Sequence, residues 1–211
     1  MASRRLPVYL LLDTSGSMFG EPIEAVNNGL NVLISSLRQD PQAIDSVHIA
    51  ILTFDKEVKV VSDLTPIDVF MPPVLIAPES GPTNLGLGLS KLRELRSANV
   101  IAGDSVNKGD WAPFLFVMTD GKASDTKLFL EECGRIGSEG YANIVGCLAG
   151  PDAHREDLER FCDPLVHLDS MDMGTFQTLF RWVSSAITAQ KNSMGAISKT
   201  ELPPPPMEIV I

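Results

Sequence analysis

The chain has 211 residues, of which 44% are hydrophobic and 21% charged, and its formal net charge is −10. This length and composition are typical of one large globular domain with enough apolar residues for a buried core. The acidic balance argues against nucleic acid and anionic membranes as partners, because both bind clustered Lys and Arg. No apolar run reaches the roughly 18 residues of a membrane-spanning helix.

The cysteines and the start of the chain predict a cytoplasmic protein. Cys133, Cys147 and Cys162 are odd in number, and their spacing matches no zinc-binding pattern. The apolar run after Arg4 and Arg5 is too short for a secretory signal peptide and has no small-residue cleavage site.

The first elements are a strand, a helix and a hairpin. Residues 7–12 form an apolar run that predicts a buried strand, and the sequence DTSGS follows at residues 13–17. A helix is predicted next, because apolar residues recur every 3.6 positions from Ile23 to Leu37. Residues 47–54 and 57–61 predict two hairpin strands, of which the second suits a half-exposed edge.

The middle of the chain alternates between irregular and regular segments. Residues 65–82 are rich in proline, so no long regular structure is expected there. A helix is predicted from Thr83, because leucines recur at positions 85, 89, 92 and 95. Residues 102–112 predict a polar loop. Residues 114–118 form a continuous apolar run, typical of a central strand, which the sequence TDG follows.

The alternation of helices and strands continues to about residue 190. The sequence predicts helices at residues 124–136 and 153–161, strands at 142–149 and 165–168, and a final amphipathic helix. From residue 191 the periodicity stops, and Pro203–Pro206 imply an extended polyproline segment. We therefore predict one domain over residues 1–190 and a flexible, proline-rich tail over residues 191–211.

Alternating strands and helices predict an α/β doubly wound fold. Its sheet should be mostly parallel, with one antiparallel edge strand and helices on both faces. In such sheets, ligands bind beyond the carboxyl ends of the strands, at the point where the strand order reverses. Asp13 and Asp120 each follow an apolar strand, so we expect both at this edge.

Five residues carry a resemblance to a known family. Asp13, Ser15 and Ser17 in DTSGS, Thr83 in GPTN and Asp120 in TDG resemble the metal-ion-dependent adhesion site (MIDAS) of von Willebrand factor A domains. The resemblance covers about residues 6–190. It implies that the serines and the threonine supply hydroxyl oxygens, whereas the aspartates bind the ion directly or through water. The implied cation is Mg²⁺, with Mn²⁺ or Ca²⁺ as alternatives.

Two segments carry a narrower resemblance. LPVYLLLDTSGSM at residues 6–18 and KGDWAP at residues 108–113 resemble the TerY-type proteins of bacterial tellurium-resistance clusters. This implies a bacterial cytoplasmic protein that acts in tellurite or stress response, with cluster-encoded partners such as a kinase and a phosphatase. Related chains can carry a C-terminal cysteine-rich metal-binding module. Functions tied to that module are not transferred, because this chain ends in a proline-rich segment instead.

The chemistry of the five residues favours a metal-dependent protein-interaction module. Mg²⁺ prefers six oxygen ligands, so a site built from hydroxyls and two aspartates leaves a position for a partner's Glu or Asp. Each motif alone has an ordinary explanation as a helix N-cap or a turn. Their order along the chain and their placement after predicted strands favour the metal site.

Two alternatives from other classes stay open. One is a metal-independent scaffold subunit of a larger stress-response complex. The other, more remote, is a Mg²⁺-dependent phosphoryl-transfer enzyme. Ser15 stands where haloacid-dehalogenase-like enzymes need a second Asp, and Lys122 is too near Asp120 for a receiver domain. Without a GxxxxGK loop or a supported nucleophile, we expect no enzyme.

The tail gives a further hypothesis. Glu201 and Glu208 stand on either side of the four prolines, and each has an apolar neighbour. Either could be offered to the metal site of a neighbouring molecule, as a self-association contact. The composition of the tail favours the simpler interpretation, an unstructured end.

Overall fold

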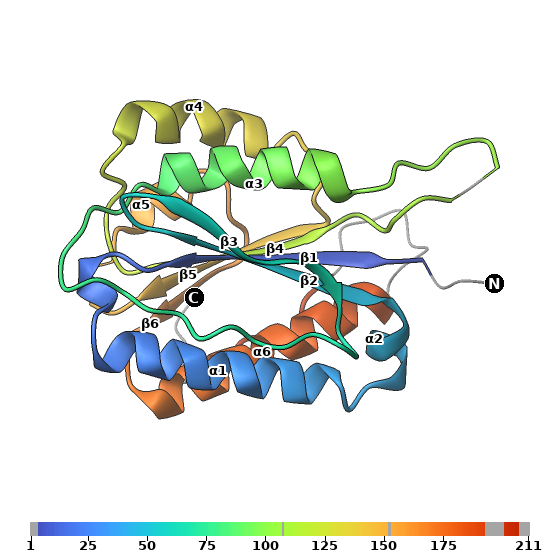
Figure 1. Cartoon of the computed structure of the whole chain (residues 1–211), viewed down its shortest axis with the longest axis horizontal. Coiled ribbons are helices and arrows are strands. Elements are labelled where there is room, and N and C mark those ends of the chain that lie inside the picture. The colour runs from blue at the N-terminus through green and yellow to red at the C-terminus, as the bar shows by residue number, and fades with distance from the viewer. Residues whose placement is uncertain (1–3, 107, 152, 193–200, 207–211) are drawn as a thin grey trace.

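The computed structural model describes residues 4–106, 108–151, 153–192 and 201–206. They form a six-stranded sheet with strand order β3-β2-β1-β4-β5-β6, with helices on both faces (Figure 1). The strands pair in parallel, except that β3 runs antiparallel to β2 at one edge. The predicted class, a doubly wound α/β fold with one antiparallel edge strand, is therefore confirmed.

The first half of the chain follows the predicted order with one addition. The helix α2 was not predicted, because six residues are too few to show a helical period. It begins after Asp40, whose side chain accepts a hydrogen bond from the Gln42 N–H at 2.9 Å. The elements are β1 (Leu6–Asp13), the 3-10 turn η1 (Gly16–Met18), α1 (Glu21–Leu37), α2 (Pro41–Ser46), β2 (Val47–Phe54), β3 (Val58–Pro66) and α3 (Leu85–Asn99).

The second half also matches the prediction, and its ends differ by only a few residues. The largest difference is the short helix after β5, which has one turn instead of the predicted nine residues. The elements are β4 (Phe114–Thr119), α4 (Thr126–Ile136), β5 (Asn143–Ala149), α5 (Arg155–Leu158), β6 (Leu165–Leu168) and α6 (Met173–Asn192).

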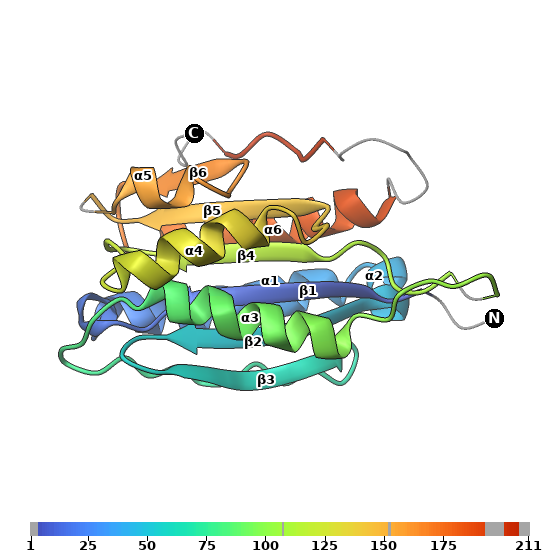
Figure 2. The same ribbon diagram turned by 90° about the horizontal axis from the view of Figure 1, so that it is seen from above.

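The sheet is buried on both faces, which explains its continuous apolar strands. Along β1, Leu10 and Leu12 face a core shared with α1 and α6, whereas Tyr9 and Leu11 face a core shared with α3 and α4. Figure 2 shows α3 and α4 side by side across the strands. Every residue of β1 is buried, so no polar alternation can appear in its sequence.

The helices α1 and α6 pack closely because α1 has a glycine at their contact. A Cβ atom at Gly29 would overlap the Phe180 ring of α6. The same ring packs against Phe116 of β4, with 5.9 Å between the ring centroids. Gly29 thus lets α6 bring an aromatic side chain into the core beneath the sheet.

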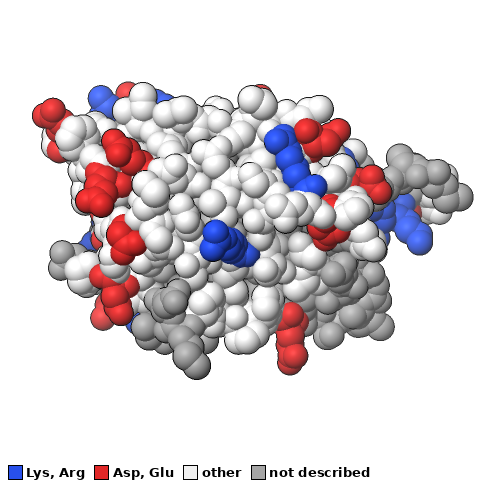
Figure 3. Space-filling model, turned by 90° about the horizontal axis from the view of Figure 1, so that it is seen from below, with Lys and Arg blue, Asp and Glu red and all other residues white. Residues whose placement is uncertain are grey.

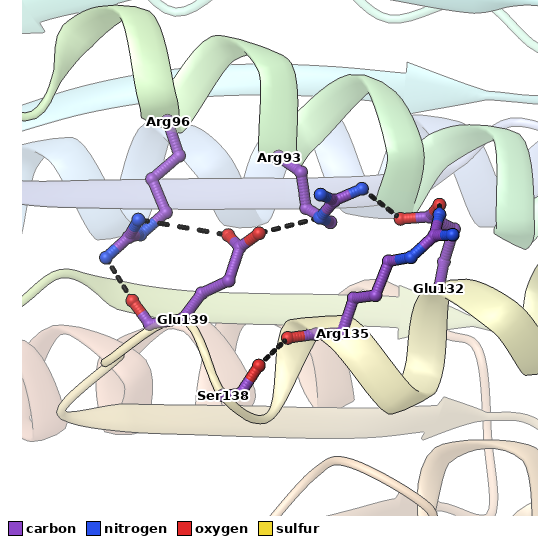
Figure 4. A network of polar contacts seen from close by, with 6 residues as sticks. All are labelled: Arg93, Arg96, Glu132, Arg135, Ser138 and Glu139. Carbon is purple, nitrogen blue, oxygen red and sulfur yellow. Dashed lines mark hydrogen bonds and ion pairs between the residues drawn. The ribbon is translucent and has the colours of Figure 1, made fainter.

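On the opposite face, α3 and the end of α4 are joined by a network of ion pairs (Figure 4). The buried carboxylate of Glu132 accepts hydrogen bonds from Arg93 at 2.9 Å and from Arg135 at 2.6 Å. Arg93 also binds Glu139, with 2.6 Å between Nε and Oε1. Two arginines therefore neutralise a carboxylate that is removed from water.

The described part of the tail lies against α6. The Trp182 indole donates a hydrogen bond to the Pro203 carbonyl at 2.9 Å, and the partly buried Leu202 packs against the core. Glu201 is exposed, and Glu208 lies outside the described residues. The domain boundary at residue 190 stays a prediction. Within the described residues, no helix combines the length and apolar character that a membrane crossing requires.

Candidate metal centre

Four of the five predicted metal residues, all except Thr83, lie at or just after the carboxyl ends of the two central strands. β1 pairs with β2 on one side and with β4 on the other, so the strand order reverses between β1 and β4. Leu12 is level with Met118 across this pair. Asp13 and Asp120 therefore leave the same edge of the sheet, as expected for a ligand site in this fold class.

Asp13 is a fully buried carboxylate held by two hydrogen bonds. Oδ1 accepts the Ser15 N–H at 2.7 Å, and Oδ2 accepts the Thr119 hydroxyl at 2.5 Å. Burial is the main cause that raises the pKa of Asp13 to about 6; the charge of Asp120 acts in the same direction, and the hydrogen bonds from Thr119 and Ser15 oppose it. Asp13 forms no ion pair with any residue that the structure describes, so a bound cation would favour its charged form.

Two serines connect the first loop to Asp120. The hydroxyl oxygens of Ser15 and Ser17 are 3.2 Å apart, and the Ser17 hydroxyl donates to Asp120 Oδ1 at 2.9 Å. Ser15 is buried, whereas Ser17 is exposed to solvent. These side chains form a row of oxygen atoms that runs from the interior to the surface.

Thr83 reaches the same edge from a third loop. Its N–H donates to the Ser124 hydroxyl at 3.1 Å, and its carbonyl accepts the Ser124 N–H at 2.8 Å. Its own hydroxyl faces Gly121, where an added Cβ would lie 3.3 Å from Oγ1. Thr83 is therefore fixed beside the loop that carries Asp120.

Hydrogen bonds join the loop after β1 to the loop between β2 and β3 and to the loop before α3. The Gly16 N–H donates to the Gly81 carbonyl at 3.4 Å, and a Cβ at Gly16 would overlap the backbone of Ser80. The buried Asp55 accepts the Thr14 hydroxyl at 3.5 Å, and its carbonyl accepts the Asn84 N–H at 3.2 Å. The first loop is thus held to the loop before α3 on both sides.

This donor set fits a small, hard cation. Its side chains offer only oxygen atoms, from two carboxylates and three hydroxyls, and Asp13 lacks a cationic partner among the described residues. Mg²⁺ and comparable ions prefer such ligands. No cluster of three or more His, Cys, Asp and Glu side chains offers another metal site within the described ranges. Binding of a cation by Asp13, Ser15, Ser17, Thr83 and Asp120 stays a prediction.

Sequence reasoning missed the residues that support this site. Thr119, Asp55 and Ser124 hold the loops in place but were not among the predicted site residues. Thr119 precedes Asp120 in the TDG motif, which was the one available signal for its role. Its hydrogen bond to Asp13 forms because β1 and β4 are neighbours in the sheet. A local sequence motif does not specify which strands are neighbours.

The family model of the von Willebrand factor type A domain matches residues 8–180 of the chain. No curated protein matches it. Among solved structures, a von Willebrand factor type A protein from Catenulispora acidiphila is similar, with 17% identity and a TM-score of 0.69 over 89% of this chain. The mussel byssus proximal thread matrix protein 1, solved with a zinc-occupied MIDAS motif, has 18% identity and a TM-score of 0.60 over 87% of this chain.

The pilus adhesin SpaC from Lactobacillus rhamnosus GG shares the fold as well, with 12% identity and a TM-score of 0.69 over 90% of this chain. At these identities the likeness concerns the fold alone. The chain covers 43%, 48% and 31% of the lengths of these three proteins, respectively, which is less than half of each.

Proposed function

Because the chain belongs to the von Willebrand factor type A domain family, we propose that it is a protein-binding module that recognises a partner's carboxylate through a metal ion. Asp13, Ser15, Ser17, Thr83 and Asp120 would hold the ion, with Mg²⁺ as the expected cation. The bound ion supplies a positive charge at the surface, to which a Glu or Asp of the partner binds. The protein's own residues orient the ion and keep one side of it open to solvent.

The observation that carries this proposal is the row of oxygen atoms from the buried Asp13 to the exposed Ser17. A carboxylate that is removed from water without an ion pair is costly unless a cation or further hydrogen bonds compensate it. The exposed end of the row gives a partner access to that cation. We therefore propose a role in binding and not in catalysis.

Isothermal titration of Mg²⁺, Mn²⁺ and Ca²⁺ into chelator-treated protein tests the site. We expect one-to-one binding that Ser15→Ala and Asp120→Ala abolish. Ser35→Ala on the exposed side of α1 and Asp63→Ala on β3 are matched controls that should bind as the wild type does. Binding that survives both site substitutions would overturn the assignment.

The metal-independent scaffold is the second candidate, and one observation favours it. Ser17 donates to Asp120, and Thr119 donates to Asp13, so the loops are already hydrogen-bonded to one another without an ion. A scaffold would bind its partner equally well in EDTA and with Ser15→Ala. A metal-dependent module would lose its partner under both conditions.

The biological setting is proposed on the TerY-like segments alone. They support a bacterial cytoplasmic role in tellurite or broader stress response, with a kinase or phosphatase encoded nearby among the candidate partners. Deletion of the gene should raise tellurite sensitivity, and a Ser15→Ala allele should fail to restore resistance. Restoration by that allele would separate the stress role from the metal site.

Self-association through the tail is a separate proposal. An exposed Glu201 is compatible with it, and Glu208 lies outside the described residues. Glu201→Gln and Glu208→Gln together should reduce any metal-dependent self-association seen in analytical ultracentrifugation. A metal-dependent oligomer that is unaffected by both substitutions would reject the tail as ligand.

A further inference from the structure

The segment between β3 and α3 contains a run of ten residues, VFMPPVLIAP at positions 69–78, without a single polar side chain. We call residues 69–78 the apolar strip. Three of its residues, Phe70, Leu75 and Ala77, are buried in the core shared with α1 and α6. Between them, Met71, Val74 and Ile76 are 79%, 81% and 80% exposed. The strip thus turns a row of large apolar side chains outward.

The exposure of the strip is fixed by α1. Asn27 forms two hydrogen bonds with the Leu75 backbone, one from its amide group to the carbonyl at 2.9 Å and one from the Leu75 N–H at 2.8 Å. Directly after the end of the helix, Arg38 donates to the carbonyls of Ile67 at 2.9 Å and Phe70 at 2.5 Å. Asn27 in α1 and Arg38 at its C-terminal end therefore hold the strip and keep its outer row exposed. Protein surfaces rarely carry such a row unless something binds it.

The strip leads directly into the candidate metal centre. Glu79 alone separates the strip from Ser80 and Gly81, which contact Gly16 in the first metal loop, and Thr83 lies two residues after Gly81. At about 3.3 Å per residue, the nine steps from Met71 to Ser80 extend up to about 30 Å. Residues 78–82 are all exposed, so an exposed stretch of chain joins the strip to the metal centre.

The charges around this surface indicate what can bind there. Acidic side chains lie at both ends of the face that carries α1 and α6, whereas its middle is mostly uncharged apart from isolated basic groups (Figure 3). Glu21 and Glu24 at the start of α1, and Glu79 between the strip and Thr83, are exposed. These carboxylates would repel a partner segment with several acids. A single acid beside apolar residues fits both the cation and the strip.

We propose that the apolar strip is the second half of the partner-binding surface, and that the partner is a protein with an extended segment. In that segment, one Glu or Asp reaches the metal, and apolar side chains over the next eight to ten residues cover Ile76, Val74 and Met71. This inference rests on the proposed metal-dependent function and adds the chemistry of the partner. The metal supplies the anchor, and the strip supplies selectivity among acidic segments.

A selection from random peptides displayed on phage, carried out in Mg²⁺, tests the inference without a known partner. We expect peptides with one acidic residue and several apolar residues on one side of it. The strip variant Met71→Ser/Val74→Ser/Ile76→Ser should bind the selected peptides at least tenfold more weakly than the wild type. The control Ile101→Ser/Val106→Ser/Leu130→Ser, which replaces exposed apolar residues elsewhere, should bind them normally.

Each other outcome has a distinct meaning. Peptides that need Mg²⁺ and Ser15 but bind the strip variant normally would overturn this inference and leave the metal-dependent function intact. Failure to select any peptide whose binding requires Mg²⁺ and Ser15 would overturn both. A wild-type dimer in ultracentrifugation that the strip variant abolishes would identify a second copy of the chain as the occupant, and would reject an extended partner segment.

Discussion

Asp125 accepts hydrogen bonds from the N–H groups of Gly86 and Leu87, at 3.0 and 2.7 Å, and so caps a helix other than its own. It precedes α4 but makes no side-chain cap there, and its carboxylate lies at the start of α3. The negative charge suits the positive end of the α3 dipole. The loop after Asp120 is thereby attached to the helix that follows Thr83.

Loss of this cap should destabilise the fold. We expect Asp125→Ala to lower the free energy of unfolding by about 1–2 kcal/mol, the usual cost of removing an N-cap. Urea denaturation measures it, with the exposed Asp63→Ala as the control, for which we expect a change within about 0.5 kcal/mol. An equal effect of the two substitutions would show that the cap contributes nothing.

Alanine should change the stability of the protein in opposite directions at two helical glycines, Gly29 at the contact between α1 and α6 and Gly134 in α4. Gly29→Ala should destabilise the protein by about 1–3 kcal/mol, because the added methyl group overlaps the Phe180 ring. Gly134→Ala in α4 meets no atom within 4 Å, so it should stabilise the protein by up to about 1 kcal/mol through helix propensity. Thermal unfolding of both variants distinguishes packing from propensity.

Two glycines near the metal centre, Gly16 and Gly81, should also respond differently to substitution by alanine. A Cβ at Gly16 would lie 2.5 Å from the Ser80 Cα, whereas one at Gly81 would lie at ordinary contact distance, 3.6 Å from a Pro78 side-chain atom and 4.0 Å from the Gly16 nitrogen. Gly16→Ala should therefore separate the first loop from Thr83 and weaken Mg²⁺ binding at least tenfold, by about 1.4 kcal/mol. Gly81→Ala should bind as the wild type does. Titration calorimetry checks both, and equal affinities would contradict the role of Gly16.

The buried Glu132 should make the protein sensitive to the loss of Arg93. Arg93→Met leaves a buried carboxylate with Arg135 as its remaining described partner, so we expect a loss of about 2–3 kcal/mol in unfolding free energy. Lys91→Met removes one member of an exposed pair and should change it by less than about 0.5 kcal/mol. The double variant Arg93→Met/Glu132→Leu should recover part of the loss. A further decrease would contradict this explanation.

The contribution of Asp172, at the start of α6, to the free energy of unfolding should depend on pH below pH 4. The side chain of Asp172 binds the Ser170 hydroxyl and both the N–H and the hydroxyl of Thr175, which lowers its pKa from 3.8 to about 2. Because the folded state favours the charged form, this stabilisation is complete above pH 4 and is lost as the pH falls toward 2. The difference in stability between wild type and Asp172→Asn should narrow over that window. A difference independent of pH would exclude the carboxylate charge as its cause.

The sequence predicted those parts of the fold that have local signals. Periodic apolar residues, as from Ile23 to Leu37, and continuous apolar runs, as in β1 and β4, predicted the type and the chain order of nearly every helix and strand. The edge position of β3 followed from its mixed charged and apolar residues. Glu132 gave no such signal, because a glutamate on an amphipathic helix is ordinarily solvated. Its burial depends on Arg93, which lies 39 residues away in the chain.

The candidate metal centre was predictable in its members but not in its supports. Each of the five residues belongs to a short motif that follows a predicted element, so a common edge could be inferred from strand direction. The bond from Thr119 to Asp13 and the cap from Asp125 to α3 depend on which elements are neighbours. The outward row of Met71, Val74 and Ile76 was also hidden, since proline-rich sequence indicates irregular backbone and not which side chains it exposes.

The prolines of the apolar strip have a consequence for solubility at high protein concentration. An exposed, extended run with uncharged apolar side chains is the kind of segment that seeds cross-β aggregation. Pro72, Pro73 and Pro78 have no N–H group, so another strand cannot form a continuous ladder of hydrogen bonds along this run. The chain can therefore expose a row of apolar side chains while the prolines in its backbone oppose fibril growth.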